Sequence, residues 1–219
     1  MHLEPIQQTD LSYQVYQRIK AMILDGSLLP GEKIPQEKIA AQLGVSRMPL
    51  HKAFVLLEEE FLVESIPRRG IFVTKPDIQA IIDAFECREG LEGIAARRAA
   101  EHLTDAEIDE MEALFDSAIN GNQITHSEYQ RADHAFHEAI IQSSGNQVMR
   151  RLNNIGSVLI RTYPKGIILP LEESMADHRK IIKAFRDRDA EKAEALVRDH
   201  SRKAIRILEK ELAENYDNR

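Results

Sequence analysis

Four side chains in the second half of the chain have the types and spacing of a metal-binding site. Asp133 and His137 are four residues apart, so on a helix both point to the same side. His178 and His200 follow on two later segments with helical periodicity. Imidazole and carboxylate groups suit divalent transition ions such as Zn, Ni or Mn, and the cores of helical bundles often hold such sites. These four residues are therefore candidate ligands of one divalent metal.

The same residues also have a plain structural interpretation. The chain contains eight histidines, so one Asp–His pair at this spacing is expected by chance. His134 is rotated by about 100° from the Asp133–His137 face and is predicted to lie beside the site. Cys87 is expected to be a buried structural thiol rather than a ligand.

A second group of residues, in the first third of the chain, could bind DNA. Two short helices are predicted, about 36–43 and from Ser46 onward, with a glycine-containing turn between them. On the second helix Arg47 and His51 share one face. Arginine can bond the O6 and N7 atoms of guanine, and Met48 could contact a thymine methyl group. This pattern alone is common in small helical domains.

A hairpin is predicted directly after these helices, and it is independent support for a winged helix-turn-helix. Residues 61–66 and 70–74 are rich in strand-forming side chains, and the segment between them contains Arg68 and Arg69. The arginines and Gly70 at this tip could contact the DNA backbone or minor groove.

The remainder of the chain shows only helical patterns, at about 77–101, 104–120, 125–143, 146–163, 172–187 and 189–214. The predicted fold class is therefore mainly α. An N-terminal winged helix-turn-helix domain, 1–75, precedes an all-α antiparallel bundle of about six helices, 76–219.

Composition narrows the class of protein. Residues 1–75 hold nine basic and nine acidic side chains, so the formal charge of −7 belongs entirely to residues 76–219. A neutral first domain leaves room for a locally basic DNA-binding face. No apolar run is long enough for a membrane span or signal peptide, and no membrane association is expected. The single cysteine fits a cytoplasmic protein.

Residues 15–73 closely resemble the DNA-binding domain of the GntR family of transcription regulators. The resemblance rests on three runs: Ile23–Glu32, Ile39–Pro49 and Pro67–Val73. It implies DNA contacts at Lys33, Ser46, Arg47, Met48, His51, Arg69 and Gly70. The family usually has Arg-Glu at His51-Lys52, which implies a different operator preference, and Glu-Gly-Leu at Glu60-Phe61-Leu62.

Residues 83–208 resemble the FCD effector-binding domain of the FadR branch of that family. The matching runs are Arg88–Glu92, Asp133–His137, Ser144–Asn146, Asp177–Ala184 and Ala190–Ala193. The resemblance places the metal ligands on Asp133, His137, His178 and His200. It also implies a carboxylate-facing arginine at Arg88, with Arg161 as a second candidate for that role. Four protein ligands on an octahedral ion leave two positions, where a small organic acid could bind.

These features predict a homodimeric, ligand-responsive transcription regulator, expected to be a repressor, that binds a palindromic operator in double-stranded DNA. Its metal-binding domain would bind a small carboxylate effector. Two alternatives keep the same four ligands, namely a purely structural metal and a direct metal sensor. A metal-dependent hydrolase is a remote alternative, because no nucleophile motif, phosphate-binding glycine loop or placed general base is found. The protein is therefore not expected to be an enzyme.

Overall fold

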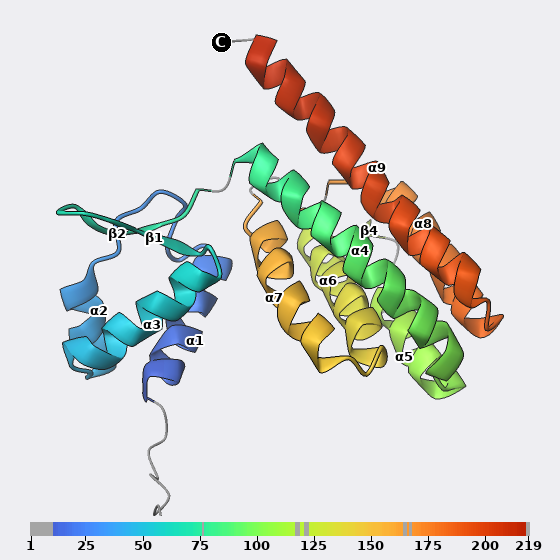
Figure 1. The fold of residues 1–219 in the computed structure, drawn as a ribbon, viewed down its shortest axis with the longest axis horizontal. Helices are drawn as coiled ribbons and strands as arrows, with labels where there is room; N and C mark the ends of the chain where they lie inside the picture. The colour runs from blue at the N-terminus through green and yellow to red at the C-terminus, as the bar shows by residue number, and fades with distance from the viewer. Residues whose placement is uncertain are drawn as a thin grey trace, which may run out of the picture. The chain divides into compact units, whose positions relative to one another are not determined.

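The structure, a computed structural model, describes residues 11–75, 77–116, 119–120, 123–163, 166 and 168–217. Its internal contacts divide the chain into two compact units, Met1–Lys75 and Pro76–Arg219. Both units are dominated by helices, so the predicted class, mainly α, is confirmed (Figure 1). No helix among the described residues is long and apolar enough to cross a membrane.

The first unit has three helices, α1 (Leu11–Leu24), α2 (Gln36–Leu43) and α3 (Arg47–Glu59). Helices α1 and α3 pack together through side chains that recur at helical spacing, and those of α3 are Leu50, Ala53, Phe54 and Leu57. Helix α2 ends at Gly44, whose φ of 65° is the left-handed conformation that glycine adopts without a Cβ clash. The left-handed backbone at Gly44 ends α2, so that α3 begins as a separate helix at Arg47. Ser46 is the N-cap residue of α3, but its side chain makes no capping hydrogen bond.

An antiparallel hairpin follows α3. Strand β1 (Val63–Ile66) pairs with β2 (Gly70–Val73), with Val63 opposite Val73 and Ile66 opposite Gly70. A bridge between Lys33 and Phe72 adds the segment before α2 to this small sheet. The first strand begins two residues later than the sequence predicts, because Phe61 takes a positive φ of 58°. The predicted winged helix-turn-helix is confirmed.

The described part of the second unit contains six helices and one short strand pair. The helices are α4 (Ile78–His102), α5 (Asp105–Asp116), α6 (His126–Ser143), α7 (Gln147–Arg161), α8 (Leu171–Arg186) and α9 (Ala190–Asp217). Helix α4 contacts α6, α7, α8 and α9 and lies alongside α9 (Figure 1). Small residues allow this close approach. A Cβ atom on Gly93 of α4 would lie 2.8 Å from the Arg198 side chain of α9.

Two predictions for this unit are wrong. The helix predicted over 104–120 ends at Asp116, and β3 (Ile119–Asn120) pairs with β4 (Gln123–Ile124). The Gly-Asn dipeptide between the paired residues Asn120 and Gln123 is a signal for a two-residue hairpin loop, and it outweighs the helical pattern. Cys87 is exposed rather than buried, because it lies on a solvent-facing position of α4, next to Glu86, which is also exposed.

Candidate metal centre

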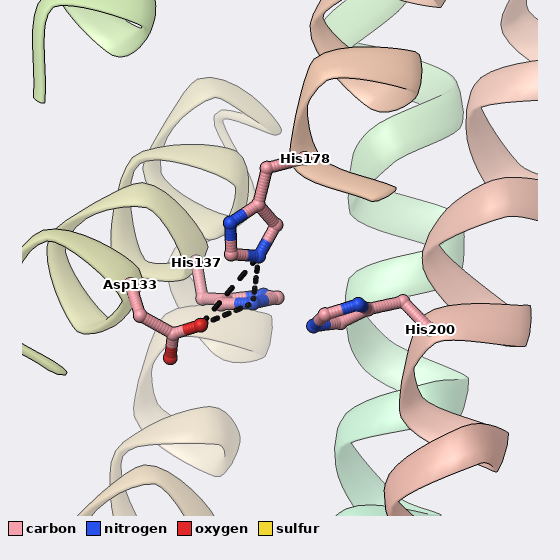
Figure 2. A group of neighbouring side chains, drawn as sticks. All are labelled: Asp133, His137, His178 and His200. Carbon is pink, nitrogen blue, oxygen red and sulfur yellow. Dashed lines mark hydrogen bonds and ion pairs between the residues drawn. The ribbon is translucent and has the colours of Figure 1, made fainter. Parts of the chain in front are cut away.

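Three helices bring the four predicted ligands together inside the second unit. Asp133 and His137 lie one turn apart on α6, His178 lies on α8 and His200 on α9. One ligand atom from each lies within 4.8 Å of the others. The three histidines are buried, while the Asp133 side chain is 23% exposed. Figure 2 shows the four side chains pointing toward a common centre.

The short distances at this centre join groups that carry lone pairs. His137 Nε2 lies 3.3 Å from His178 Nε2. Asp133 Oδ1 lies 3.8 Å from the first of these nitrogens and 3.5 Å from the second. Whether these atoms repel or bind a cation depends on which ring nitrogen of each histidine carries the proton.

The outer ring nitrogens settle that question for two histidines. His137 Nδ1 lies 2.6 Å from Oε2 of buried Glu92, so Nδ1 donates to the carboxylate. His178 Nδ1 lies 3.2 Å from the Tyr129 hydroxyl oxygen, and that hydroxyl donates its own proton to Ser174 Oγ at 2.7 Å. Both histidines therefore carry the proton on Nδ1 and present an unprotonated Nε2 to the centre. A carboxylate or hydroxyl behind each imidazole is the usual support of a metal-ligating histidine.

His200 has a comparable acidic neighbour. Its buried Nδ1 lies 3.5 Å from Asp177 Oδ2. Contacts with His200 and with Lys203, whose Nζ donates to Asp177 at 2.6 Å, hold the pKa of Asp177 well below its usual range. A charged carboxylate is thereby kept behind the third imidazole.

Burial keeps the candidate ligands in the form that binds metal. Desolvation, reinforced by the Arg88 guanidinium, lowers the pKa of His137 well below its ordinary value. Desolvation and the neighbouring His200 do the same for His178. Neutral imidazoles and a carboxylate converging from three helices fit a divalent transition ion.

A small cavity of about 60 Å³ opens beside the centre, and Asp133, His137 and His200 form part of its wall. Both predicted effector arginines line it. Arg88 is buried, and its Nε donates to Glu92 Oε1 at 2.9 Å. Arg161 reaches it from the end of α7. His134 also lines this cavity, beside the centre as predicted, and burial followed by Arg161 lowers its pKa to about 4.

The predicted DNA-contacting residues all lie in the first unit. Arg47 and Met48 begin α3 with side chains 90% and 67% exposed, and His51 is exposed one turn later. At the hairpin the Arg69 guanidinium lies 5.4 Å from the centre of the Phe72 ring. The Lys33 side chain also lies at the hairpin, because a Cβ atom added to Gly70 would lie 3.1 Å from the Cε atom of Lys33. The exposed start of α3 and the hairpin tip thus carry the side chains expected to contact DNA.

For two residues that line the cavity, Glu92 and Asn153, the sequence predicts no function. Glu92 forms hydrogen bonds with both Arg88 and His137. The sequence feature that could have identified it is its four-residue spacing from Arg88 on an otherwise alanine-rich helix face. Asn153 lies in the cavity wall although it sits in the middle of α7. A polar residue on an inward position of an amphipathic helix is the signal that could have identified it.

Comparisons with known proteins agree with this architecture. Residues 11–73 match the bacterial regulatory proteins of the gntR family, and residues 83–203 match the FCD domain. The chain is 30% identical over 198 residues to a probable D-xylose utilization operon transcriptional repressor of Paenarthrobacter nicotinovorans, covering 88% of this chain and 86% of that protein. It is 24% identical to the transcriptional repressor RspR of Escherichia coli, over 94% of this chain and 92% of the repressor.

Solved structures share the fold. Escherichia coli McbR/YncC superposes with a TM-score of 0.72 at 20% identity, over 94% of this chain and all of that one. A putative GntR regulator from Rhodococcus sp. RHA1 gives a TM-score of 0.68 at 23% identity, over 91% of this chain and 98% of the other. With a winged helix-turn-helix and an FCD domain that together span most of its length, the chain belongs to the gntR family of DNA-binding transcriptional regulators.

Proposed function

We propose that this regulator binds a divalent transition metal at Asp133, His137, His178 and His200, and that the metal holds a small organic acid which modulates operator binding. The observation that carries the proposal is the convergence of two unprotonated Nε2 atoms and a carboxylate oxygen. Without a cation, this arrangement leaves three lone-pair-bearing atoms facing one another in a buried site, which is costly. The metal would supply open coordination positions for a chelating carboxylate.

The cavity supports an effector role over a purely structural one. A structural site is closed by protein ligands on all sides. Here three of the four candidate ligands form part of a cavity wall, and Asp133 remains partly exposed. Arg88 lines the same cavity, where its guanidinium would attract a carboxylate. A direct metal sensor would use the same ligands and differs only in responding without an acid.

For the first unit, we infer that α3 enters the major groove of DNA, with Arg47, Met48 and His51 toward the bases. Ser46 at the helix N-terminus would bind phosphate, while Arg69, Gly70 and Lys33 would contact the backbone or minor groove. A homodimer would present two such units to a palindromic operator. The names of two relatives favour repression.

The test measures metal content and operator release with the full-length protein. We expect one metal per chain, and release of operator DNA by a small carboxylate only when the metal is present. The double substitution His178→Ala with His200→Ala should abolish metal content, whereas His102→Ala, an exposed histidine on α4, should leave it unchanged. Arg88→Ala should keep the metal but reduce the response to the acid.

Each failure points to a different error. Full metal content in the double variant would show that the ligands are wrongly assigned. Operator release by metal alone would favour the sensor. Metal binding with no response to any carboxylate would leave a structural metal.

A further inference from the structure

The exposed apolar side chains of the second unit gather on two neighbouring helices. Five large apolar side chains are exposed in the part of this unit that the structure describes, and four of them lie on α4 and α7. Each of the four is between 37% and 67% exposed, and they are Ile94 on α4 and Val148, Leu152 and Ile155 on α7. These four residues and the exposed residues of α4 from Asp83 to Arg98 form what we call the α4–α7 face. A contiguous apolar patch on a protein surface usually marks a contact with another molecule.

The four apolar side chains lie on the same side of the contact between the two helices. Helices α4 and α7 run in opposite directions and approach closely, since a Cβ atom on Gly156 would lie 3.5 Å from the Ala84 carbonyl oxygen (Figure 1). On one side of this contact, Arg88 and Asn153 line the cavity. Helical spacing turns Ile94 and the exposed apolar residues of α7 to the other side. The α4–α7 face is therefore continuous, and it is separate from the cavity.

Along α4 this face carries opposite charges at its two ends. One exposed stripe of the helix contains residues at intervals of four or seven, namely Asp83, Cys87, Ile94 and Arg98. Asp83 and Arg98 have no ion-pair partner among the described residues, although Asp83 accepts a hydrogen bond from the uncharged Gln79 side chain at 2.8 Å. Asp83 lies seven residues before Gly90, and Arg98 lies seven residues after Leu91. The two charges are thus equally far from the centre of the stripe and opposite in sign.

Packing among the described residues does not require the glycine at the centre of this stripe. A Cβ atom on Gly90 would meet no described atom within 4 Å, whereas one on Gly93 would lie 2.8 Å from the Arg198 side chain. Glycine in the middle of a helix is less stable than alanine, but it allows another backbone to approach closely. A glycine without a packing role inside the chain therefore indicates close contact with a second molecule at Gly90.

We propose that the α4–α7 face binds the same face of a second copy of this chain, with the two α4 helices crossing in opposite directions at Gly90. A two-fold axis through this point makes every contact twice. It brings Asp83 of each copy opposite Arg98 of the other, and it covers the apolar side chains of α7. The charges identify a second copy as the occupant, because a two-fold axis at Gly90 reverses the stripe end for end. The proposal rests on the homodimer of the proposed function, to which it assigns a surface, and it is independent of the metal and the acid.

Charge reversal tests the pairing of Asp83 with Arg98. In sedimentation equilibrium of the full-length protein, Arg98→Glu and Asp83→Arg should each weaken the dimer by at least about tenfold, because like charges then face each other at both ends. The double variant restores opposite charges and should dimerise within about threefold of the unaltered protein. Arg179→Glu makes the same change of charge at an exposed position of α8, outside the face, and should have no effect. A double variant as weak as the single variants would overturn the pairing.

Two further substitutions test the centre and the apolar flank of the face. Gly90→Gln should keep the helix content seen by circular dichroism, because its Cβ meets no described atom within 4 Å, and should weaken the dimer by at least about tenfold. Leu152→Glu should weaken it to a similar extent, because an unpaired charge would be buried between the two copies. Ile207→Glu places the same charge on α9, outside the face, and serves as control. Unchanged dimerisation of both Gly90→Gln and Leu152→Glu would show that the dimer forms elsewhere.

The unaltered protein separates this proposal from the homodimer on which it rests. A dimer that none of these substitutions weakens would overturn only the α4–α7 face. A monomer at the concentrations at which the protein binds its operator would overturn the homodimer as well. Helix content, measured on every variant, distinguishes loss of the dimer from loss of the fold.

Discussion

Glu92 is a buried carboxylate that links Arg88, the proposed effector arginine, to His137, a proposed metal ligand. It accepts from Arg88 Nε at 2.9 Å and from His137 Nδ1 at 2.6 Å. Burial raises the pKa of Glu92, and the adjacent Arg88 guanidinium opposes this by favouring the charged form. The position of the His137 ring, and hence of its Nε2, depends on this contact.

Glu92→Gln is therefore expected to weaken zinc binding by about 10- to 100-fold, the usual effect of losing a carboxylate behind a ligating histidine. Competition with a chromophoric chelator at neutral pH measures the change. Glu89→Gln is the control, because Glu89 pairs with Arg202 at 2.7 Å, away from the centre. Equal zinc affinity in the two variants would contradict the positioning role.

Arg47 is the residue on which direct base contact is most expected. Its side chain is 90% exposed, and its nearest charged partner, Glu37, lies 3.5 Å away and is equally exposed, so little holds it in place. Arg47→Ala should reduce operator affinity by about 10- to 100-fold with the fold retained. Arg18→Ala, at an exposed position of α1, serves as control. Gel-shift titration gives both values, and unchanged operator affinity for Arg47→Ala would refute its base-reading role.

Phe61 occupies a conformation that suits glycine better. Its φ is 58° and its side chain is 57% exposed. For a residue with a Cβ atom, this left-handed region is less favourable by about 1 kcal/mol or more of conformational free energy. Phe61→Gly should therefore raise the unfolding free energy of the first unit by about 1 kcal/mol relative to Phe61→Ala, which removes the ring but keeps the Cβ. Urea denaturation of both variants measures the difference, and equal stability would contradict the strain.

At the scale of elements, α6 carries two candidate ligands and begins with a capping box. The Thr125 hydroxyl accepts from the Glu128 amide at 3.3 Å, and the Glu128 carboxylate accepts from the Thr125 amide at the same distance. A similar pair, Thr104 and Glu107, lies at the start of α5, where the sequence has the same Thr-x-x-Glu spacing.

Thr125→Ala should lower the unfolding free energy of the second unit by about 1 kcal/mol, as loss of an N-cap does. The Thr125 hydroxyl lowers the pKa of Glu128 in the folded protein. The stabilisation from this contact is therefore fully present above the pKa of Glu in the unfolded chain, about 4, and is lost as the pH falls through the lower pKa of the folded state. The difference between variant and unaltered protein should thus shrink in acid. Urea denaturation at pH 7 and pH 3 tests both statements, and a constant difference would contradict the second.

For the whole molecule, the proposed metal connects α6, α8 and α9 and should stabilise the second unit. A ligand at about 100 times its dissociation constant adds about 2.7 kcal/mol to the unfolding free energy. In a unit of this size that corresponds to a rise of about 5–10 °C in Tm. Differential scanning calorimetry of chelator-treated and zinc-loaded protein should show this shift in the transition of the second unit alone. An identical Tm with and without zinc would contradict a metal that joins the three helices.

Much of the architecture follows from local patterns. The helices have long runs of apolar side chains at helical spacing, and Gly44 and the capping boxes mark several of their ends. The exception is the strand pair after α5. Its Gly-Asn turn signal spans only two residues, and it competes with a longer helical pattern in the same segment.

The sequence by itself determined the residue types of the candidate metal centre, and it placed Asp133 and His137 on one helix face because they are four residues apart on α6. Only the tertiary structure decided which groups stand behind them. Glu92 and Asp177 are far from their histidines in the sequence and come close because α4, α6, α8 and α9 pack together. On α7, likewise, only the packing of the helices showed that Asn153 lines a cavity while Leu152 is exposed. Helical periodicity fixes which residues share a face, but the direction in which that face points depends on contacts between helices distant in the chain.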